Sequence, residues 1–110
     1  MYLINTTFQV DNGIADDFIA LLRDGFIPDS TGCQCGVKVP VLTRIRPVEG
    51  AFDPDSTGIA LQVRATDGAA FRRYTEESLP SLLDGLQRRW GMKVMFFTSV
   101  LDIIPLEDHG

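Results

Sequence analysis

The sequence contains little of the chemistry that metal centres and acid–base catalysts usually need. Its single histidine, His109, is the last residue but one, and its two cysteines, Cys33 and Cys35, are separated by one residue. A structural zinc site takes about four cysteine or histidine ligands, and a catalytic histidine needs neighbours that orient it. We therefore predict no metal site, neither a metal nor a functional disulfide at Cys33 and Cys35, and no catalytic role for His109.

Motifs of nucleotide-binding and hydrolytic enzymes are also missing from the sequence. The chain has no glycine-rich phosphate fingerprint, no G-x-S-x-G nucleophile turn and no H-E-x-x-H motif. The segment DPDSTG brings Asp53, Asp55 and Gly58 close together, but it lacks the spacing and the final glutamate of an EF-hand. We predict that the protein uses no cofactor, and no catalytic residue is assigned.

Positive charge and long apolar runs are scarce as well. Fifteen acidic residues against ten basic ones give a net charge of -5 and an isoelectric point of about 4.6. Such a surface repels phosphate backbones and anionic lipids, and no apolar run reaches the roughly 20 residues of a membrane-spanning helix. The sequence therefore predicts no nucleic-acid partner, no membrane partner, and a cytoplasmic protein without a signal peptide.

What the chain does have is alternation of apolar and polar residues, which is typical of β-strands. The predicted strands cover residues 2–10, 37–46, 58–65 and 93–103. Pro40 cannot donate to a strand ladder, so the second strand is expected at a sheet edge. With strict alternation, Leu42 and Arg44 lie on the opposite side of this strand from Val41 and Thr43.

The first helical region is predicted over residues 14–25, where apolar residues recur at helical spacing. Asp11 or Asn12 is expected to cap its start. Pro28 is expected to end any continuation of the helix, and residues 29–36, which are small, polar and rich in glycine, are expected to form a loop.

The second helical region contains Pro80, and proline is tolerated only in the first turn of a helix. The sequence therefore predicts two separate pieces, near residues 68–77 and 79–90, with Ser78 as the cap of the second. Candidate caps for the first piece are Thr66 and Asp67.

Together these elements predict a strand-helix-strand-strand-helix-strand order in a single domain, residues 1–110. With right-handed crossovers this order gives the α+β, ferredoxin-like fold, a four-stranded antiparallel sheet with both helices on one face. The strand order in the sheet would be 4-1-3-2. It places the first strand in the centre and the strand with Pro40 at an edge, as the residue patterns independently suggest.

Three segments carry a resemblance to a known family: MYLINTTFQV at the start, FIPDSTG after the first helix, and the block YTEESLPSLL followed by RRWGMKVMFFTSVL. Over nearly its whole length the chain resembles an uncharacterised bacterial family of domains of unknown function, of about this length. The resemblance implies a dimeric α+β barrel, in which ferredoxin-like protomers pack sheet against sheet. The same group holds small monooxygenases, isomerases and stress-response dimers.

The chain departs from this family at two positions. Relatives often carry a histidine just before the Ile-Pro and another just before the proline of the second helix. Here Phe26 stands at the first position, and Ser78 and Leu79 precede Pro80. The resemblance therefore implies that any histidine site of the relatives is lost in this chain.

Candidate ligand-binding residues come from the mixed face of the predicted sheet. Its polar members are Asn5, Thr7, Arg44, Gln62 and Arg64. Two arginines among amides and hydroxyls suit the carboxylate or phosphate of a small molecule. The alternative is that these are interface or solvent positions of an ordinary antiparallel sheet. Tyr74 joins the candidates if a pocket forms under the helices, and core packing is the alternative for it.

The last strand suggests how the second sheet face is covered. If Val94, Phe96 and Val100 point to the helices, then Met95, Phe97, Leu101 and Ile103 point away. With Leu3 and Leu42 they would form a contiguous apolar patch, which soluble monomers rarely expose beyond a few hundred Å². The sequence therefore predicts a sheet-to-sheet homodimer, with Leu3, Phe97 and Leu101 in its interface.

Composition and motifs leave the function unknown, and two classes stay open beside a small dimeric protein without recognisable chemistry. One is a cofactor-independent enzyme, similar to a monooxygenase or an isomerase, that acts on a hydrophobic or acidic small molecule. The other is a binder of such a molecule. An RNA-binding module is disfavoured, because the third strand GIALQVRA carries no stacking aromatic residue and the net charge is negative.

Overall fold

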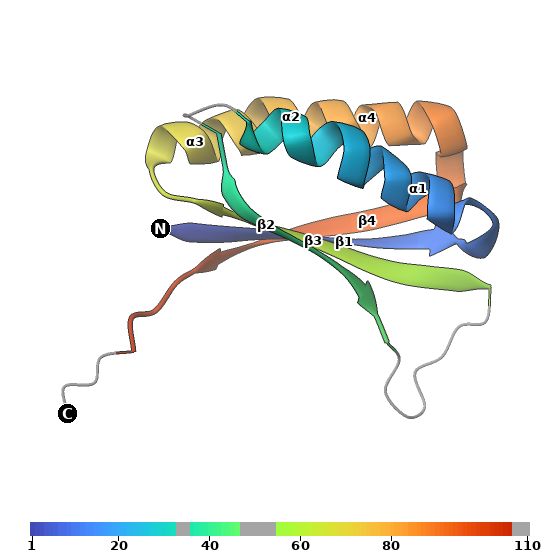
Figure 1. Cartoon of the computed structure of the whole chain (residues 1–110), viewed down its shortest axis with the longest axis horizontal. Coiled ribbons are helices and arrows are strands. Elements are labelled where there is room, and N and C mark those ends of the chain that lie inside the picture. Colours follow the sequence, from blue (N-terminus) through green and yellow to red (C-terminus); the bar gives the residue numbers. More distant parts are fainter. Residues whose placement is uncertain (33–35, 47–54, 107–110) are drawn as a thin grey trace.

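The computed structural model describes residues 1–32, 36–46 and 55–106. Cys33, Cys35, Asp53 and His109, discussed above, lie outside these residues. The strands are β1 (Tyr2–Asp11), β2 (Lys38–Ile45), β3 (Ser56–Ala65) and β4 (Val94–Asp102). They form one antiparallel sheet in the order β2-β3-β1-β4 (Figure 1), which confirms the predicted topology and the edge position of the strand with Pro40.

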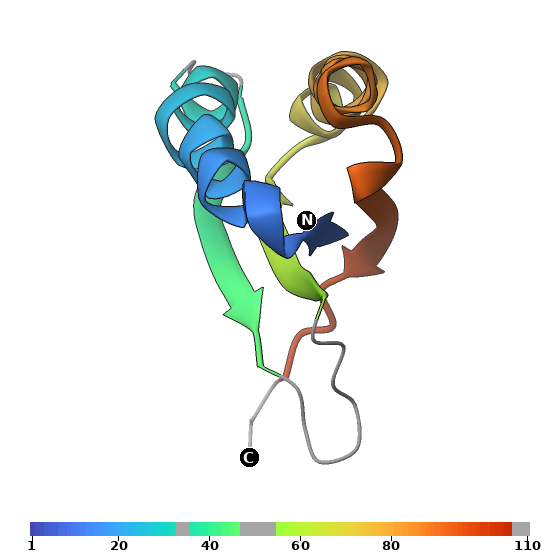
Figure 2. The same ribbon diagram turned by 90° about the vertical axis from the view of Figure 1, so that its right-hand side faces the viewer.

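Two helical segments cover one face of this sheet (Figure 2). The first consists of η1 (Asn12–Ile14), α1 (Ala15–Leu21), η2 (Leu22–Phe26) and α2 (Ile27–Thr31). The second consists of α3 (Gly68–Arg73), η3 (Tyr74–Ser78), α4 (Leu79–Trp90) and η4 (Gly91–Lys93). The α+β, ferredoxin-like fold is thus confirmed.

Both helical segments continue past a proline because a π-helical turn comes just before it. In η2 the Ile27 N–H donates to the Leu22 carbonyl, five residues back. A π-turn holds more residues than an α-turn and shifts the carbonyls of the preceding turn, which avoids the clash that a proline ring makes in an α-helix. The expectations that Pro28 ends the first helix, and that a loop begins at residue 29, are therefore wrong: α2 reaches Thr31.

The second helical segment also has a π-helical turn, η3, just before its proline. The Leu79 N–H donates to the Tyr74 carbonyl, and the helix continues through Pro80. The predicted cap at Ser78 is wrong, because this residue is helical and its side chain makes no capping bond. Asp67, one of the two predicted caps for the start of this region, does cap it, because its Oδ1 accepts a hydrogen bond from the Ala70 N–H at 2.8 Å.

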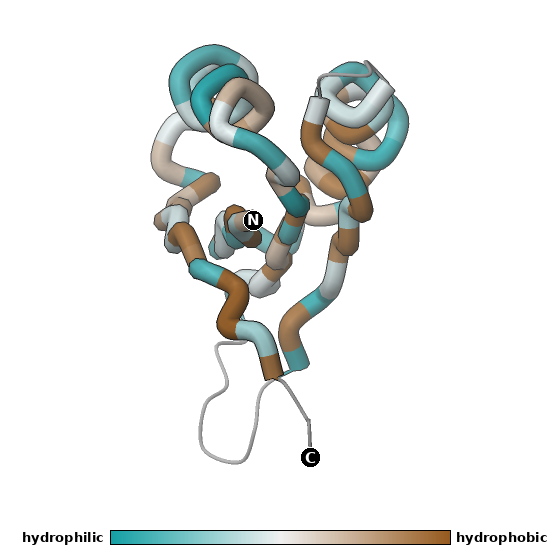
Figure 3. Tube along the Cα trace, turned by 90° about the vertical axis from the view of Figure 1, so that its left-hand side faces the viewer, coloured by the Kyte–Doolittle hydropathy of each residue, from teal (hydrophilic) through white to brown (hydrophobic). Residues whose placement is uncertain are grey.

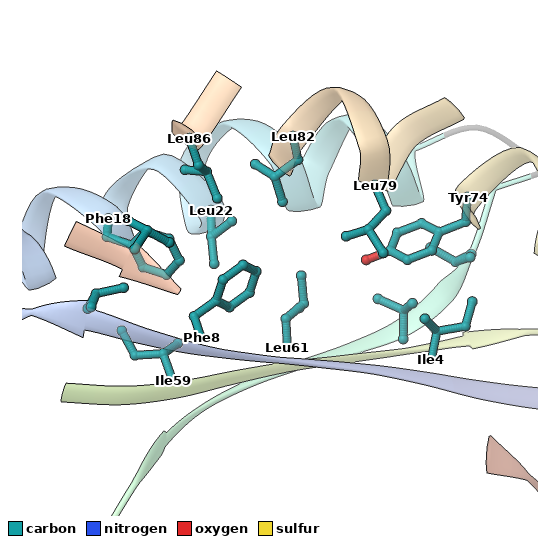
Figure 4. Close-up of a cluster of buried hydrophobic side chains, with 14 of the residues drawn as sticks. Ile4, Phe8, Phe18, Leu22, Ile59, Leu61, Tyr74, Leu79, Leu82 and Leu86 are labelled. Atoms are coloured by element: carbon teal, nitrogen blue, oxygen red, sulfur yellow. The ribbon is translucent and has the colours of Figure 1, made fainter. Parts of the chain in front are cut away.

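The core fills the space between the helices and the sheet (Figure 4). Phe8, at the centre of β1, is fully buried, and its ring lies 4.9 Å from the ring of Phe18 in α1. Leu61 of β3 and Leu86 of α4 are also buried in this layer. Thr6 is the buried polar residue of the layer, and its hydroxyl is paired with that of Thr98 at 3.0 Å.

A β-bulge in β2 changes the side that its residues face. Lys38 pairs with Arg64, whereas Val41 pairs with Gln62, so β2 holds one more residue than β3 over this stretch. Pro40 lies inside the bulge, where its missing N–H disturbs no ladder bond. The alternation of side chains is therefore reversed after residue 40.

This reversal corrects two predictions. Leu42 and Arg44 were expected on the mixed face, away from the helices, and this is wrong. Leu42 pairs with the buried Leu61 and Arg44 with the buried Ile59, which places both on the helix side of the sheet. The alternation assumed for β2 fails because the periodicity of the sequence does not reveal that one residue is inserted in the strand.

Candidate functional site

The term open face is used here for the sheet surface opposite the helices. Residues that pair directly across strands point to the same side of the sheet. The open face therefore includes the rows Lys38-Arg64-Leu3-Leu101, Val41-Gln62-Asn5-Ser99, Thr43-Ala60-Thr7-Phe97 and Ile45-Gly58-Gln9-Met95, and the pair of Asp11 and Ser56 continues it at one end.

Apolar side chains line both edges of the open face. On β4, Met95 is 66% and Phe97 62% exposed, and Leu101 is also exposed. On β2, Val41 and Ile45 are exposed. Figure 3 shows hydrophobic segments along these edge strands. Exposed large apolar side chains gathered on one surface are typical of an interaction site.

The centre of the open face is polar or small. Asn5 and Thr7 lie on the central strand β1, and the Asn5 side-chain amide donates to the Thr7 hydroxyl at 3.3 Å. Ala60 and Gly58 on β3 have little or no side chain. This face therefore has large groups at its margins and room along its middle.

One end of the open face carries two cations side by side. Arg64 of β3 pairs directly with Lys38 of β2. The Arg64 Nε is buried and has no hydrogen-bond partner, and it is the one such side-chain atom among residues 1–32, 36–46 and 55–106. A buried donor without a partner costs about 1–3 kcal/mol of stability. A hydrogen-bond acceptor placed at the Arg64 Nε–H would therefore remove this cost.

A second candidate is a cavity of about 250 Å³ between the two helical segments, next to α2 and η3. Its lining includes Asp29, Ser30, Tyr74 and Ser78. A neighbouring cavity of about 300 Å³ shares Asp29, Ser30 and Ser78 with it. The Ser30 hydroxyl is already engaged, because it donates to the Phe26 carbonyl at 2.8 Å.

Tyr74 is the most deeply buried polar side chain beside this cavity, at 2% exposed. Its ring lies 6.0 Å from that of Phe26 and beneath Leu79 (Figure 4), and within the described residues no hydrogen bond to its hydroxyl is found. Burial raises the pKa of the Tyr74 phenol, which therefore stays neutral at physiological pH.

Replacing Tyr74 by phenylalanine is therefore expected to leave the free energy of unfolding unchanged, or to raise it by up to about 1 kcal/mol. Above pH 10 the unfolded phenol ionises while the folded one does not, so the wild type should lose up to about 1.4 kcal/mol per pH unit relative to Tyr74→Phe. Urea titrations of both proteins between pH 7 and about pH 11 measure this difference. Equal losses in the two proteins would contradict the raised pKa of this phenol.

The structure brings together only part of the predicted ligand site. Asn5 and Arg64 share the open face, in adjacent rows. Arg44 lies on the helix side at the sheet edge, and Tyr74 packs in the helical layer. Leu3, Phe97 and Leu101 all lie on the open face, as expected for the predicted interface.

Sequence reasoning missed Lys38 as the neighbour of Arg64. The register across β2 and β3 depends on the bulge, and a bulge has no periodic signal. The residues around the cavity, such as Asp29 and Ser78, were missed because residue 29 was assigned to a loop and Ser78 to a cap. An unbroken helical pattern read through both prolines would have been the signal.

No cluster of three or more histidine, cysteine or carboxylate side chains suited to a metal ion occurs in the described parts of the chain. Within the same residues, no helix is long and apolar enough to cross a membrane.

The model of a family described as a domain of unknown function (DUF4286) matches residues 1–104. No curated protein matches the chain. Among solved structures, a dimeric ferredoxin-like protein from an uncultured marine organism is similar, with a TM-score of 0.65 and 15% identity, covering 96% of this chain and 97% of that one.

Two further structures share the fold at low identity. CPII from Thiomonas intermedia K12, a nitrogen regulatory PII-like protein in its apo form, has a TM-score of 0.51 and 14% identity, over 94% of this chain and 92% of that one. PelD from Pseudomonas aeruginosa PAO1 has a TM-score of 0.52 and 15% identity, over 93% of this chain and 32% of that one.

Proposed function

The chain belongs to this family of domains of unknown function, and we propose that it acts as a small-molecule-binding homodimer whose protomers pack through their open faces. The observation that carries the proposal is the apolar margin of the open face. In a monomer Met95 and Phe97 are more than half exposed, on the sheet side opposite the two helical segments. Burying each large apolar side chain stabilises by about 1.5–3 kcal/mol.

The arrangement of large and small residues supports a two-fold dimer. A two-fold axis that runs along β1 brings each row of the open face opposite the same row of the partner, with β4 over β3. Phe97 then meets the partner's Ala60, and Met95 meets the partner's Gly58, so large side chains face positions that leave room for them. Such reciprocal contacts are what a closed two-fold interface requires.

The similar marine protein is described as dimeric, and this supports a dimer here. Leu3 and Leu101 extend the apolar surface toward one end of the sheet, next to Arg64. The polar groups Asn5 and Arg64 lie between the apolar margins, where a small ligand enclosed by two protomers would meet them.

Ligand binding is favoured over the enzyme alternative by the placement of the candidate residues. A catalytic pocket of the expected kind needed Tyr74 together with Asn5 or the arginines. Tyr74 lies on the helix side of the sheet, and Asn5 and Arg64 lie on the open face. Tyr74 therefore cannot meet the same substrate as Asn5 or Arg64, and Arg44, although on the helix side, lies exposed on the edge strand β2.

Sedimentation equilibrium of the wild-type protein at micromolar concentration tests the dimer. The expected mass is twice the 12.2 kDa of the chain. A single species with the mass of one chain would contradict the proposal.

A further inference from the structure

We infer that the cavity of about 300 Å³ between the two helical segments binds a small primary amine, with the ammonium group at Asp29 and Ser30 and the hydrocarbon part against Phe26 and Leu82. This site goes beyond the proposed dimer and does not depend on it. The cavity is lined by helical residues, on the side of the sheet opposite the open face (Figure 2).

Both helical segments contribute to this cavity, which is called the helix cavity below. Its lining consists of Phe26, Asp29, Ser30, Ser78, Ser81 and Leu82. A water molecule takes about 30 Å³ in the liquid, so the helix cavity has room for about ten groups of that size. The cavity of about 250 Å³ next to Tyr74 shares three of these residues and adjoins it. The space therefore suits a small molecule.

The first reason for a cation is the charge at the helix cavity. Among the described residues that line it, Asp29 is the charged one. Asp29 is exposed, and within the described ranges no ion pair or hydrogen bond of its carboxylate is found. Arg73 lines only the adjoining cavity and already has an interaction of its own. The Asp29 carboxylate is therefore available to a cation from solution.

The second reason is the hydrogen-bonding capacity of the neighbouring groups. The Ser30 hydroxyl donates to the Phe26 carbonyl at 2.8 Å, and the Ile27 carbonyl lies 3.4 Å from the same oxygen. A hydroxyl has one proton, so Ser30 offers a ligand only acceptor lone pairs. The Asp29 carboxylate also only accepts. An ammonium group has three donors and no acceptor, and it therefore matches both residues.

The third reason is the course of the backbone. Free N–H groups at the start of a helix favour anions. Neither α2 nor α4 has such a start at the helix cavity, because the residues before them, Phe26 and Ser78, are themselves helical. The π-turns engage the N–H groups of Ile27 and Leu79. The backbone therefore offers an anion little at this place.

The apolar part of the lining completes the match. Leu82 is buried, and Phe26 is half-buried and packs against the core. The Phe26 ring lies 6.0 Å from that of Tyr74, which closes this side with a second aromatic ring. A short hydrocarbon chain gains from leaving water for such a wall. A primary amine with a few carbon atoms therefore fits better than the bare ammonium ion.

An NMR titration of the ¹⁵N-labelled wild-type protein with n-butylammonium chloride, at pH 7 and constant ionic strength, tests the inference. 1-Butanol and sodium butyrate carry a similar hydrocarbon chain without the positive charge. We expect saturable shifts of the Asp29, Ser30 and Ser78 amides, with a dissociation constant below about 10 mM and at least about tenfold weaker binding of both controls.

Three results would overturn the inference. The first is butanol or butyrate binding as tightly as butylammonium, and the second is a titration that does not saturate. The third is a set of shifts gathered on open-face residues such as Asn5 and Gln62 instead of the helix cavity.

Two charge variants make the test specific. Asp29→Asn should weaken butylammonium binding at least about fivefold, because it removes the counter-charge. Asp16→Asn removes the same charge from an exposed position of the same helical segment that does not line the helix cavity, and should change binding less than about twofold. Equal effects of the two variants would overturn the site.

Ser78→Leu tests the cavity itself. Ser78 lines both the helix cavity and the adjoining one, and its side chain makes no capping bond. A leucine there should fill the space and weaken butylammonium binding at least about tenfold. Unchanged binding in a folded Ser78→Leu protein would overturn the site, and circular dichroism shows whether it is folded. If it is not, the comparison of Asp29→Asn with Asp16→Asn decides.

Discussion

Phe97→Asp is expected to convert the proposed dimer into a monomer, with a dissociation constant raised more than about 100-fold. Phe97 is 62% exposed in the protomer and lies on the edge strand β4, in the row of the open face with Thr7 and Ala60. An aspartate there would bring an unpaired carboxylate into the proposed interface, against the partner's Ala60, which is strongly unfavourable. Sedimentation equilibrium over a range of concentrations measures the change.

Met92→Asp is the matched control for this variant. Met92 is 93% exposed but lies in η4, outside the sheet. This variant introduces the same charge at an even more exposed apolar residue that lies outside the proposed interface, so its dimer should be as stable as that of the wild type. Phe97→Asp protein that remains dimeric, or equal dissociation of both variants, would contradict the interface.

Phe8→Ala is expected to lower the free energy of unfolding by about 3–5 kcal/mol. Phe8 is fully buried, and its ring packs at 4.9 Å on that of Phe18, which in turn lies 6.1 Å from the ring of Trp90. The truncation removes the contact that joins the centre of the sheet to both helical segments. Natural domains have a total stability of about 5–15 kcal/mol, so the loss would be a large share of it.

Urea unfolding at a fixed protein concentration, followed by circular dichroism, measures this loss. The concentration is held fixed because the proposed dimerisation would add to the apparent stability. Met92→Ala, which truncates an exposed side chain, should change the free energy by no more than about 0.5 kcal/mol. A loss below about 1 kcal/mol for Phe8→Ala would contradict the central place of this residue in the core.

Strand positions and sheet order were predictable because they depend on local patterns. The alternation in residues 2–10 predicted β1. Pro40 predicted an edge strand, because proline has no N–H to donate to a neighbouring strand. The sides taken by Phe96 and Phe97 on β4 also follow from alternation alone: Phe96 pairs with the buried Phe8 and Phe97 with Thr7.

The π-turns were not predictable from the rule used for proline. That rule considers the clash of the ring with an α-helical turn, whereas a widened turn removes the clash. Both Pro28 and Pro80 stand two residues after such a turn, so η2 and η3 let the helices continue over the sheet. Asp29 and Ser30, which line the cavity near Tyr74, lie in the part of the first helical segment that continues past Pro28.

The candidate ligand site was predicted in part, and the bulge explains the rest. Arg64 was placed correctly because β3 alternates without interruption. Arg44 was misplaced and Lys38 was overlooked because one extra residue at Pro40 separates the two ends of β2. A single inserted residue changes which residues pair across the two strands and which side they face. The alternation of apolar and polar residues on either side of it stays regular, so the sequence does not reveal it.

Nuclear Overhauser effects between differently labelled protomers test the open-face dimer most directly. In a mixed sample of labelled and unlabelled chains, isotope filtering selects contacts across the interface only. The proposed dimer predicts contacts from the Phe97 ring to the partner's Ala60, and from the methyl groups of Leu101 and Leu3, with none from the buried Leu61 or Leu86. Intermolecular contacts confined to the helical residues Ala15–Thr31 and Gly68–Trp90 would contradict the account.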